Sequence, residues 1–250
     1  MPLRQEITDF ITESAASQEN SILFRAPLVG FADTADPLFV QLKNIVGDYH
    51  LLPSDILPSA QTAVAFFLPF SADVIKSNRS QEVSRQWAAA YIAANAAINA
   101  ICAELIDMLT AKGIEAATVA ATHNYDAETL TSPWSHRSVA CIAGLGRFGL
   151  NRMLITPVGC AGRYGSVLLS EKLSADARPD EGKEKEPCTW FREGSCRFCI
   201  DNCPTQALTE EGIDRHLCND HLLEISKNFT DIGFCDVCGK CAIGSCALRG

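Results

Sequence analysis

The sequence predicts an α/β domain followed by a small cysteine-rich domain. Over the first two-thirds of the 250-residue chain, apolar runs alternate with amphipathic or alanine-rich segments, as in strands packed against helices. Nine of the twelve cysteines lie between Cys188 and Cys246. A charged stretch with proline and glycine separates the two parts. We therefore expect a first domain at 1–175, a linker at 176–187 and a second domain at 188–250.

Each element of the first domain has a local signal. Apolar residues at helical spacing predict the first helix, and Asp36-Pro37 supplies the cap and first turn of the second. A long alanine-rich helix ends before Gly113. The continuous apolar run at 60–70, which precedes this helix in the chain, is typical of a central strand. Helices are expected at 3–16, 36–46, 81–112, 132–143 and 215–226, and strands at 27–33, 60–70, 114–122 and on both sides of a glycine-rich loop at 159–165.

Composition limits the classes of function. Hydrophobic residues make up 47% of the chain, which is enough for a substantial core. The net charge of −9 disfavours a large nucleic-acid partner, because proteins that bind phosphate backbones normally present a basic face. The start of the chain has no apolar signal core, and no run of about 18 apolar residues indicates a membrane helix. We expect a cytoplasmic protein that does not bind a membrane.

The glycines after the helix at 132–143 form a second informative region. Gly144, Gly146 and Gly149 allow the backbone to approach another group closely. No G-K-[ST] follows them, so a phosphate loop fits poorly, and a dinucleotide fingerprint would follow a strand rather than a helix. A tight helix-to-strand turn without any ligand is the alternative interpretation.

The cysteine spacing predicts iron–sulfur clusters. Cys196-x2-Cys199-x3-Cys203-Pro204 matches the end of the bacterial ferredoxin motif, in which the last cysteine ligates the other cluster of a pair. By analogy with that exchange, one [4Fe-4S] cluster takes Cys188, Cys196, Cys199 and Cys246, and the other takes Cys203, Cys218, Cys238 and Cys241. This leaves Cys235 spare, although it could replace a neighbour. Two structural zinc ions are an alternative, and a disulfide framework is a weaker one.

The two regions together resemble the epoxyqueuosine reductases and the related corrinoid reductive dehalogenases. The similarity extends over about residues 27–246. It is carried by the motifs His136-Arg137, Ala143-Gly-Leu-Gly146, Phe148-Gly149, Leu154-Ile155, Gly165-Ser166 and Cys196-x2-Cys199-Ile-Asp-x-Cys203-Pro204-Thr205.

This resemblance implies a nitroreductase-like or corrinoid-processing α/β domain against a ferredoxin-like domain with two [4Fe-4S] clusters. A base-off cobalamin would lie between them, a ferredoxin- or flavodoxin-type protein would donate electrons, and a small molecule would be reduced. The positions implied to contact the corrinoid are Arg137, Gly144, Leu145, Gly146, Arg147, Phe148, Gly149, Cys160, Gly162, Arg163, Tyr164, Gly165 and Ser166.

The sequence also departs from the family. Epoxyqueuosine reductases place an aspartate, proposed as the proton donor, at the position of Leu130, and an aromatic residue at that of Arg147. The C-terminal helical extension that helps many members to hold tRNA is absent. These departures disfavour a tRNA substrate.

A reductase needs a proton source, for which we select His136, Tyr125 and Asp126 as catalytic candidates. His123 and Tyr164 lie in the same stretches. Several candidate residues also have a purely structural interpretation. His136 could be a core or capping residue, Arg147 and Arg163 could be ordinary surface residues, and Cys160 could be a packed core residue. Two other functions remain open for the chain: an electron-transfer module that serves a partner protein, and an epoxyqueuosine reductase.

Overall fold

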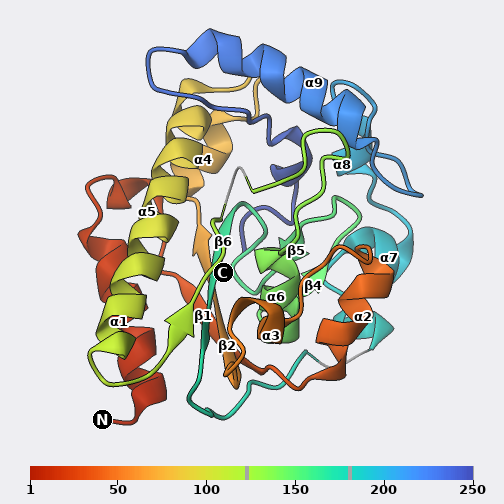
Figure 1. The fold of residues 1–250 in the computed structure, drawn as a ribbon. Helices are drawn as coiled ribbons and strands as arrows, with labels where there is room; N and C mark the ends of the chain where they lie inside the picture. Colours follow the sequence, from red (N-terminus) through yellow and green to blue (C-terminus); the bar gives the residue numbers. More distant parts are fainter. Residues whose placement is uncertain (122–123, 180–181, 250) are drawn as a thin grey trace.

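A four-stranded antiparallel sheet forms the centre of the molecule (Figure 1). The structure is a computed structural model that describes residues 1–121, 124–179 and 182–249. The strands are β1 (Leu28–Asp33), β2 (Thr62–Pro69), β6 (Gly162–Leu169) and β3 (Ala116–Ala117), in the order β1-β2-β6-β3. Strands β2 and β6 pair along their full length, from Thr62 opposite Leu169 to Pro69 opposite Gly162. The prediction of a mixed α/β fold is confirmed.

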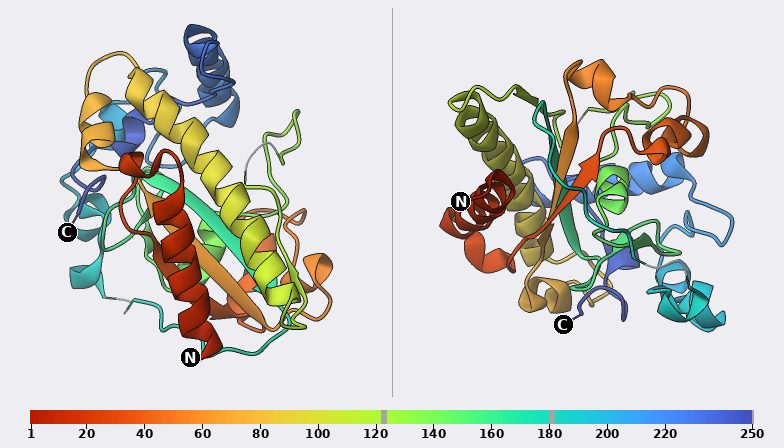
Figure 2. Two further views of the ribbon diagram at one scale, coloured as in Figure 1. Left: turned by 90° about the vertical axis from the view of Figure 1, so that its left-hand side faces the viewer. Right: turned by 90° about the horizontal axis from the view of Figure 1, so that it is seen from below.

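Helices cover both faces of this sheet (Figure 2). One face carries α1 (Leu3–Ser17), α4 (Ala72–Ser77) and α5 (Arg85–Thr110), and the other carries α2 (Pro37–Ile45), α3 (Pro53–Ile56) and α6 (His136–Ile142). All eight residues of β2 are buried, because the strand is covered on both sides. Alternation along the strand sends Val64 and Phe66 toward α5, and Ala65 and Phe67 toward α6.

Helix α5 provides most of one face of the core. The Ser84 hydroxyl accepts a hydrogen bond from the Trp87 N–H and caps the helix start. By length and composition, α5 is the only helix among the described residues that could cross a membrane. Half of its most apolar stretch is buried inside the protein, so packing against the sheet accounts for its apolar character.

The C-terminal quarter wraps around one end of the sheet and is mainly helical. It contains η2 (Lys183–Lys185), α7 (Thr189–Glu193), α8 (Phe198–Asp201), α9 (Arg215–Ser226), η3 (Lys227–Phe229) and η4 (Lys240–Ala242). Between 182 and 249 the structure contains an isolated bridge, Leu208–Ile213, but no named strand. Phe229, Ile243 and Ala247 belong to the same hydrophobic core as α5.

Three local predictions were only partly right. The strand expected at 114–122 is reduced to the two residues of β3, and β6 begins at Gly162, inside the expected loop. Helix α6 begins at His136, because the Ser135 hydroxyl accepts the capping hydrogen bond from the Ser138 N–H. The short hairpin of β4 (Arg147–Phe148) and β5 (Leu154–Ile155) then leads into β6, while η1 (Ser21–Leu23) connects α1 to β1.

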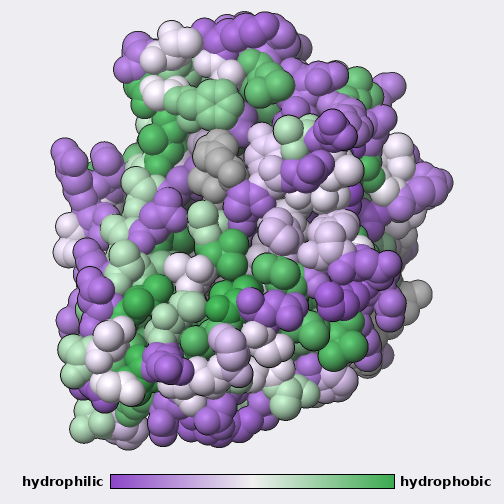
Figure 3. All heavy atoms as spheres, viewed as in Figure 1, coloured by the Kyte–Doolittle hydropathy of each residue, from purple (hydrophilic) through white to green (hydrophobic). Residues whose placement is uncertain are grey.

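Polar side chains cover most of the molecular face in Figure 3, including the outer side of α9, whereas apolar side chains gather in its central part. This is consistent with the acidic net charge of the chain.

Candidate functional site

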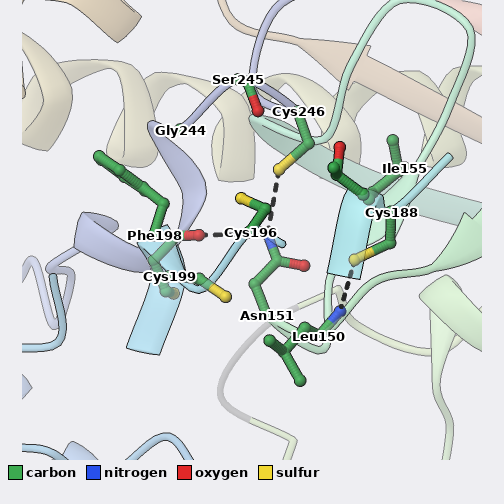
Figure 4. Close-up of a pocket in the computed structure, with 12 residues that line it drawn as sticks. Leu150, Asn151, Ile155, Cys188, Cys196, Phe198, Cys199, Gly244, Ser245 and Cys246 are labelled. Atoms are coloured by element: carbon green, nitrogen blue, oxygen red, sulfur yellow. Dashed lines mark hydrogen bonds between the residues drawn. The ribbon is translucent and has the colours of Figure 1, made fainter. Parts of the chain in front are cut away.

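Five cysteines line one small cavity at the C-terminal end of the fold, and four of them, Cys188, Cys196, Cys199 and Cys246, are labelled in Figure 4. Cys188 caps the start of α7, Cys196 and Cys199 come from the turn into α8, and Cys246 comes from the last loop. The sequence assigned these four residues to the same site. Leu150, Ile155 and Phe198 supply apolar walls beside the sulfurs.

Polar groups in this first cysteine cavity point toward sulfur. The Leu150 N–H donates to Cys188 Sγ at 3.4 Å, and the Asn151 amide reaches Cys160 Sγ at 3.5 Å and Cys246 Sγ at 3.8 Å. Burial, and the charges of Cys246 and Cys188, raise the pKa of Cys199 to about 11. A bound cation would reverse that effect, because a coordinating thiol is deprotonated. The donor set therefore fits an iron–sulfur cluster.

Cys160 lies just outside these four residues and is fully buried. Its thiol donates to Cys246 Sγ at 3.8 Å, and this contact lowers the pKa of Cys246 to about 7. The pKa of Cys160 itself is raised by the same contact and by burial. Cys160 is thus a neutral donor beside a sulfur that ionises more readily.

A second group of four cysteines lines a larger cavity of about 480 Å³. These residues are Cys203, Cys218, Cys238 and Cys241, the other set assigned from the spacing. Burial raises the pKa of Cys241 to about 12, and the charges of thiols from both groups add to this rise. Cys241 also lines the first cavity, so the two sites adjoin.

Hydrogen bonds favour the thiolate form of Cys203. Burial opposes ionisation, but the backbone of Leu208 and the Thr205 hydroxyl outweigh it, and the pKa of Cys203 is lowered. Cys235 lines neither cavity. Within the described ranges, no three His, Cys, Asp or Glu side chains lie closely enough to hold a single metal ion.

Lys240 ties the second group to the loop before α5. It is only 4% exposed, and its ammonium donates to the carbonyls of Asn78, Ser80 and Glu82 at 2.7–2.8 Å. The Asn78 amide in turn donates to the Cys238 carbonyl at 2.9 Å. This buried network holds the C-G-K-C motif against residues 78–82.

A third cavity, of about 390 Å³, adjoins the second. We call it the arginine cavity, because Arg137, Arg163 and Arg215 line it and no described residue in its wall is acidic. The three arginines, with Leu130 and Met153, also line the second cysteine cavity. They therefore lie between the thiols and a space of the size that small molecules occupy.

The chain resembles known proteins in part of its sequence and in its fold. No family model matches the chain. An epoxyqueuosine reductase from Lactococcus garvieae (strain Lg2) is 33% identical over 102 residues, or 41% of this chain and 26% of the relative. An epoxyqueuosine reductase structure from Bacillus subtilis, with its catalytic aspartate loop swung out of the active site, matches with a TM-score of 0.59 and 20% identity over 98% of this chain and 65% of that one. This chain has the epoxyqueuosine reductase fold.

The same fold occurs in a catabolic reductive dehalogenase, which matches 89% of this chain and 30% of its own at a TM-score of 0.59 and 16% identity. The predicted resemblance to both groups is thereby confirmed. The chain spans less than two-thirds of the length of the epoxyqueuosine reductase structure that it matches. The stretch that is 33% identical covers 26% of the Lactococcus garvieae enzyme.

Leu130 occupies a special place in this epoxyqueuosine reductase fold. It lines both the second cysteine cavity and the arginine cavity, at the position where the sequence resemblance places the family's aspartate. Its φ of +52° lies in the left-handed region, which costs free energy for a residue with a branched side chain. If the predicted correspondence with the family's aspartate holds, an apolar side chain takes that position in this chain.

The other acid candidates differ in position. Tyr125 lines the second cysteine cavity and is 38% exposed, so it can reach a ligand there. Asp126 lines none of the three cavities; its carboxylate accepts hydrogen bonds from Thr129, which lower its pKa. Tyr164 lines the arginine cavity, but its hydroxyl donates to the Leu154 carbonyl at 2.9 Å. His123 lies outside the described residues.

His136 lines the arginine cavity and is 7% exposed. Burial lowers its pKa to about 4, against a smaller opposing effect of the nearby Ala120 and Val119 backbone. Nδ1 lies 2.8 Å from Ser166 Oγ, which accepts from Trp134 Nε1 at 3.1 Å. The ring is therefore neutral at pH 7 and acts there as a hydrogen-bonding group, not as a charged acid.

Acid should destabilise the protein through His136. The unfolded state binds a proton below about pH 6.5 and the folded state only near pH 4, so stability falls as pH decreases through this window, by at most about 3 kcal/mol. We expect His136→Gln to flatten this part of the stability–pH curve, measured by anaerobic urea unfolding. His216→Gln, on the exposed side of α9, should keep the wild-type slope. An unchanged slope in His136→Gln would contradict the assignment.

The glycines expected along a corrinoid approach protein backbone. A Cβ on Gly144 would lie 2.6 Å from the Ala177 carbonyl oxygen, and one on Gly146 would lie 2.4 Å from that of Ile155. Arg147 is paired with Glu186 at 3.1 Å. The stretch at 144–149, which also includes Leu145, Phe148 and Gly149, lines none of the three cavities, so a cofactor contact there remains a prediction.

Of the remaining predicted cofactor positions, some line the cavities and others are packed in the core. Gly162 and Arg163 line both larger cavities, whereas Gly165 packs against Phe66 and Ile98 of the core. Sequence reasoning missed Asn151 and Lys240, although each lies close to a cysteine group. The position of Lys240 within the C-G-K-C motif was the only sequence feature that could have indicated one of them.

Proposed function

We propose that this protein is a cytoplasmic oxidoreductase that carries electrons through two [4Fe-4S] clusters to a corrinoid and thereby reduces a small molecule. One observation carries the proposal: two groups of four cysteines adjoin each other, and the second opens onto an arginine-lined cavity. In this proposal, residues 188–250 act as the ferredoxin-like part and a ferredoxin- or flavodoxin-type protein donates the electrons.

When bound, the clusters supply one-electron transfer and the corrinoid supplies a strongly reducing cobalt centre. The chain itself holds and orients these groups. Two sets of four thiolates would bind the clusters, and the Leu150 N–H and Asn151 amide stabilise negative charge on sulfur. The corrinoid would occupy space between Tyr125, Arg137 and Arg163, and the Tyr125 hydroxyl, which lines the second cysteine cavity, would supply the proton.

Anaerobic reconstitution with iron, sulfide and hydroxocobalamin tests the proposal. After desalting, we expect about eight iron atoms and one cobalt per chain and a base-off Co(II) signal in the EPR spectrum. Eight iron atoms without cobalt would remove the corrinoid and favour an electron-transfer module. Four or fewer, with the chain folded, would contradict the two-cluster assignment.

Epoxyqueuosine reduction is a second candidate, favoured by the 33% identical stretch. A structurally similar epoxyqueuosine reductase was solved with a tRNA-Tyr stem loop, at a TM-score of 0.57 and 22% identity over 94% of this chain and 63% of that one. Leu130, at the position of the family's acid, argues against the same proton transfer here. Reduction of epoxyqueuosine in tRNA by the reconstituted protein would establish this activity, and its absence with both clusters intact would exclude it.

The Cys160 thiol should raise the potential of the first cluster. Hydrogen bonds to cluster sulfurs favour the reduced state, and Cys160 donates to Cys246 Sγ. We expect Cys160→Ala to lower the potential by about 40 mV, which corresponds to one hydrogen bond of about 1 kcal/mol in a one-electron couple. Redox titration followed by EPR measures it. Cys141→Ala, away from all three cavities, should leave both potentials unchanged, and an upward shift in Cys160→Ala would contradict the role.

A further inference from the structure

The positive charge of the arginine cavity is not neutralised by the protein. The chain has 30 acidic and 21 basic residues, yet the described wall of this cavity contains three arginines and no carboxylate. Within the described part of the chain, no ion pair joins Arg137, Arg163 or Arg215 to an acidic side chain. Other arginines near the site, such as Arg147, are paired.

The two central arginines keep donors available. Arg137 uses Nη1 to donate to the Arg152 carbonyl at 3.0 Å and approaches Met153 Sδ at 3.2 Å. The Arg163 guanidinium lies over the Tyr91 ring, 4.7 Å from its centroid, and makes no described hydrogen bond. The charge of Asp236 raises the pKa of Arg163 against the effect of burial, but the Asp236 carboxylate accepts its hydrogen bond from the Tyr91 hydroxyl, at 2.6 Å. Most N–H groups of both guanidinium groups thus remain unused.

The mutual placement of these arginines costs free energy without a ligand. Arg137 reaches solvent through the cavity, but the surrounding protein is dense enough that burial lowers its pKa, and the charge of Arg163 lowers it further. Two like charges that repel in partly desolvated surroundings are stabilised by an anion between them. Guanidinium groups bind carboxylate and phosphate with strong, often bidentate hydrogen bonds.

His136 is a neutral side chain of the same wall. Its Nδ1 accepts from Ser166 Oγ, which itself accepts from Trp134 Nε1. The ring proton then resides on Nε2, which is buried from solvent, and the backbone of Ala120 and Val119 lies close enough to raise the pKa of the ring against the effect of burial. The histidine therefore adds no charge to the cavity, and the guanidinium groups are its strong donors.

We propose that the arginine cavity binds a carboxylate or phosphate group of a small ligand through Arg137 and Arg163. This inference rests on the proposed function in one respect: the anion belongs either to the molecule that is reduced or to the phosphodiester of the corrinoid. Both sources present the same chemistry to the arginines.

Binding of benzoate, inorganic phosphate and the uncharged analogue benzamide tests the site on the cluster-loaded protein. Benzoate or phosphate should bind, as measured by calorimetry and by a rise in the unfolding temperature, while benzamide should not. Arg137→Gln and Arg163→Gln should each weaken binding at least tenfold, and Arg163→Lys should restore part of it. Arg192→Gln, an exposed arginine paired with Glu193, is the matched control and should bind as the wild type.

Comparing cobalamin with cobinamide distinguishes the two possible sources of the anion, the corrinoid and the substrate. Cobinamide lacks the nucleotide phosphodiester that cobalamin carries. If Arg163→Gln weakens cobalamin binding but not cobinamide binding, the anion is that of the corrinoid; if it affects neither but abolishes benzoate binding, the anion belongs to the substrate. Benzoate binding without any corrinoid binding would retain this site and remove the corrinoid proposal. Equal binding of benzamide and benzoate, or anion binding unchanged in both glutamine variants, would overturn the inference.

Discussion

Replacing Cys199 by alanine is expected to remove one proposed cluster and to leave the other. Cys199 lines the first cysteine cavity with Cys188, Cys196 and Cys246, whereas the second cavity has its own four cysteines. The iron content should fall from about eight to about four atoms per chain, because a cubane that loses a thiolate ligand is readily lost. Cys218→Ala should produce the same loss at the second site. Metal analysis after anaerobic reconstitution measures both changes.

Cys102→Ala is the matched control for these variants. Cys102 is also a buried cysteine, but it lies within α5 and lines neither cysteine cavity. Its replacement should retain about eight iron atoms. The EPR spectra should then identify which reduced cluster each ligand variant keeps. Full iron content in Cys199→Ala, or loss of half the iron in Cys102→Ala, would show that the cysteines are grouped differently.

Elements that depend on neighbouring residues were predicted from the sequence, whereas boundaries that depend on contacts between distant residues were not. Strand β2 and helix α5 were found from local signals, which are an apolar run and an alanine-rich stretch closed by Gly113. The limits of β3 and β6 could not be found in this way. Strand β6 begins at Gly162 because it pairs with Pro69 of β2, more than ninety residues earlier in the chain.

The candidate site shows the same contrast. Short cysteine spacings indicated the clusters, and the analogy with the ferredoxin motif divided eight cysteines into two groups of four. Asn151 and Lys240 were missed, because the contacts of Asn151 with Cys246 and of Lys240 with Asn78 cross 95 and 162 positions of sequence. The glycines were ambiguous, since a missing Cβ serves equally for approach to a ligand or, as at Gly146, to a carbonyl group.

The largest expected loss of stability comes from Lys240→Met. The variant keeps an apolar stem of similar length but removes an ammonium that donates to the carbonyls of Asn78, Ser80 and Glu82. These carbonyls would lose a charged donor in a largely buried environment. We expect the free energy of unfolding to fall by about 3 kcal/mol, measured by anaerobic urea unfolding of the reconstituted protein.

The same change should act selectively on the second cysteine group. Lys240 lies between Cys238 and Cys241, and Gly239 beside it adopts a φ of +72° against the Trp87 ring, where a Cβ would lie 2.2 Å from a ring carbon. Loss of the lysine frees this loop, so the cluster held through Cys238 and Cys241 should be lost first while the first cluster persists. Lys227→Met, an exposed lysine paired with Glu224, should change neither stability nor iron content. Equal stability of the two lysine variants would mean that the loop is held by the cluster itself and not by the buried network.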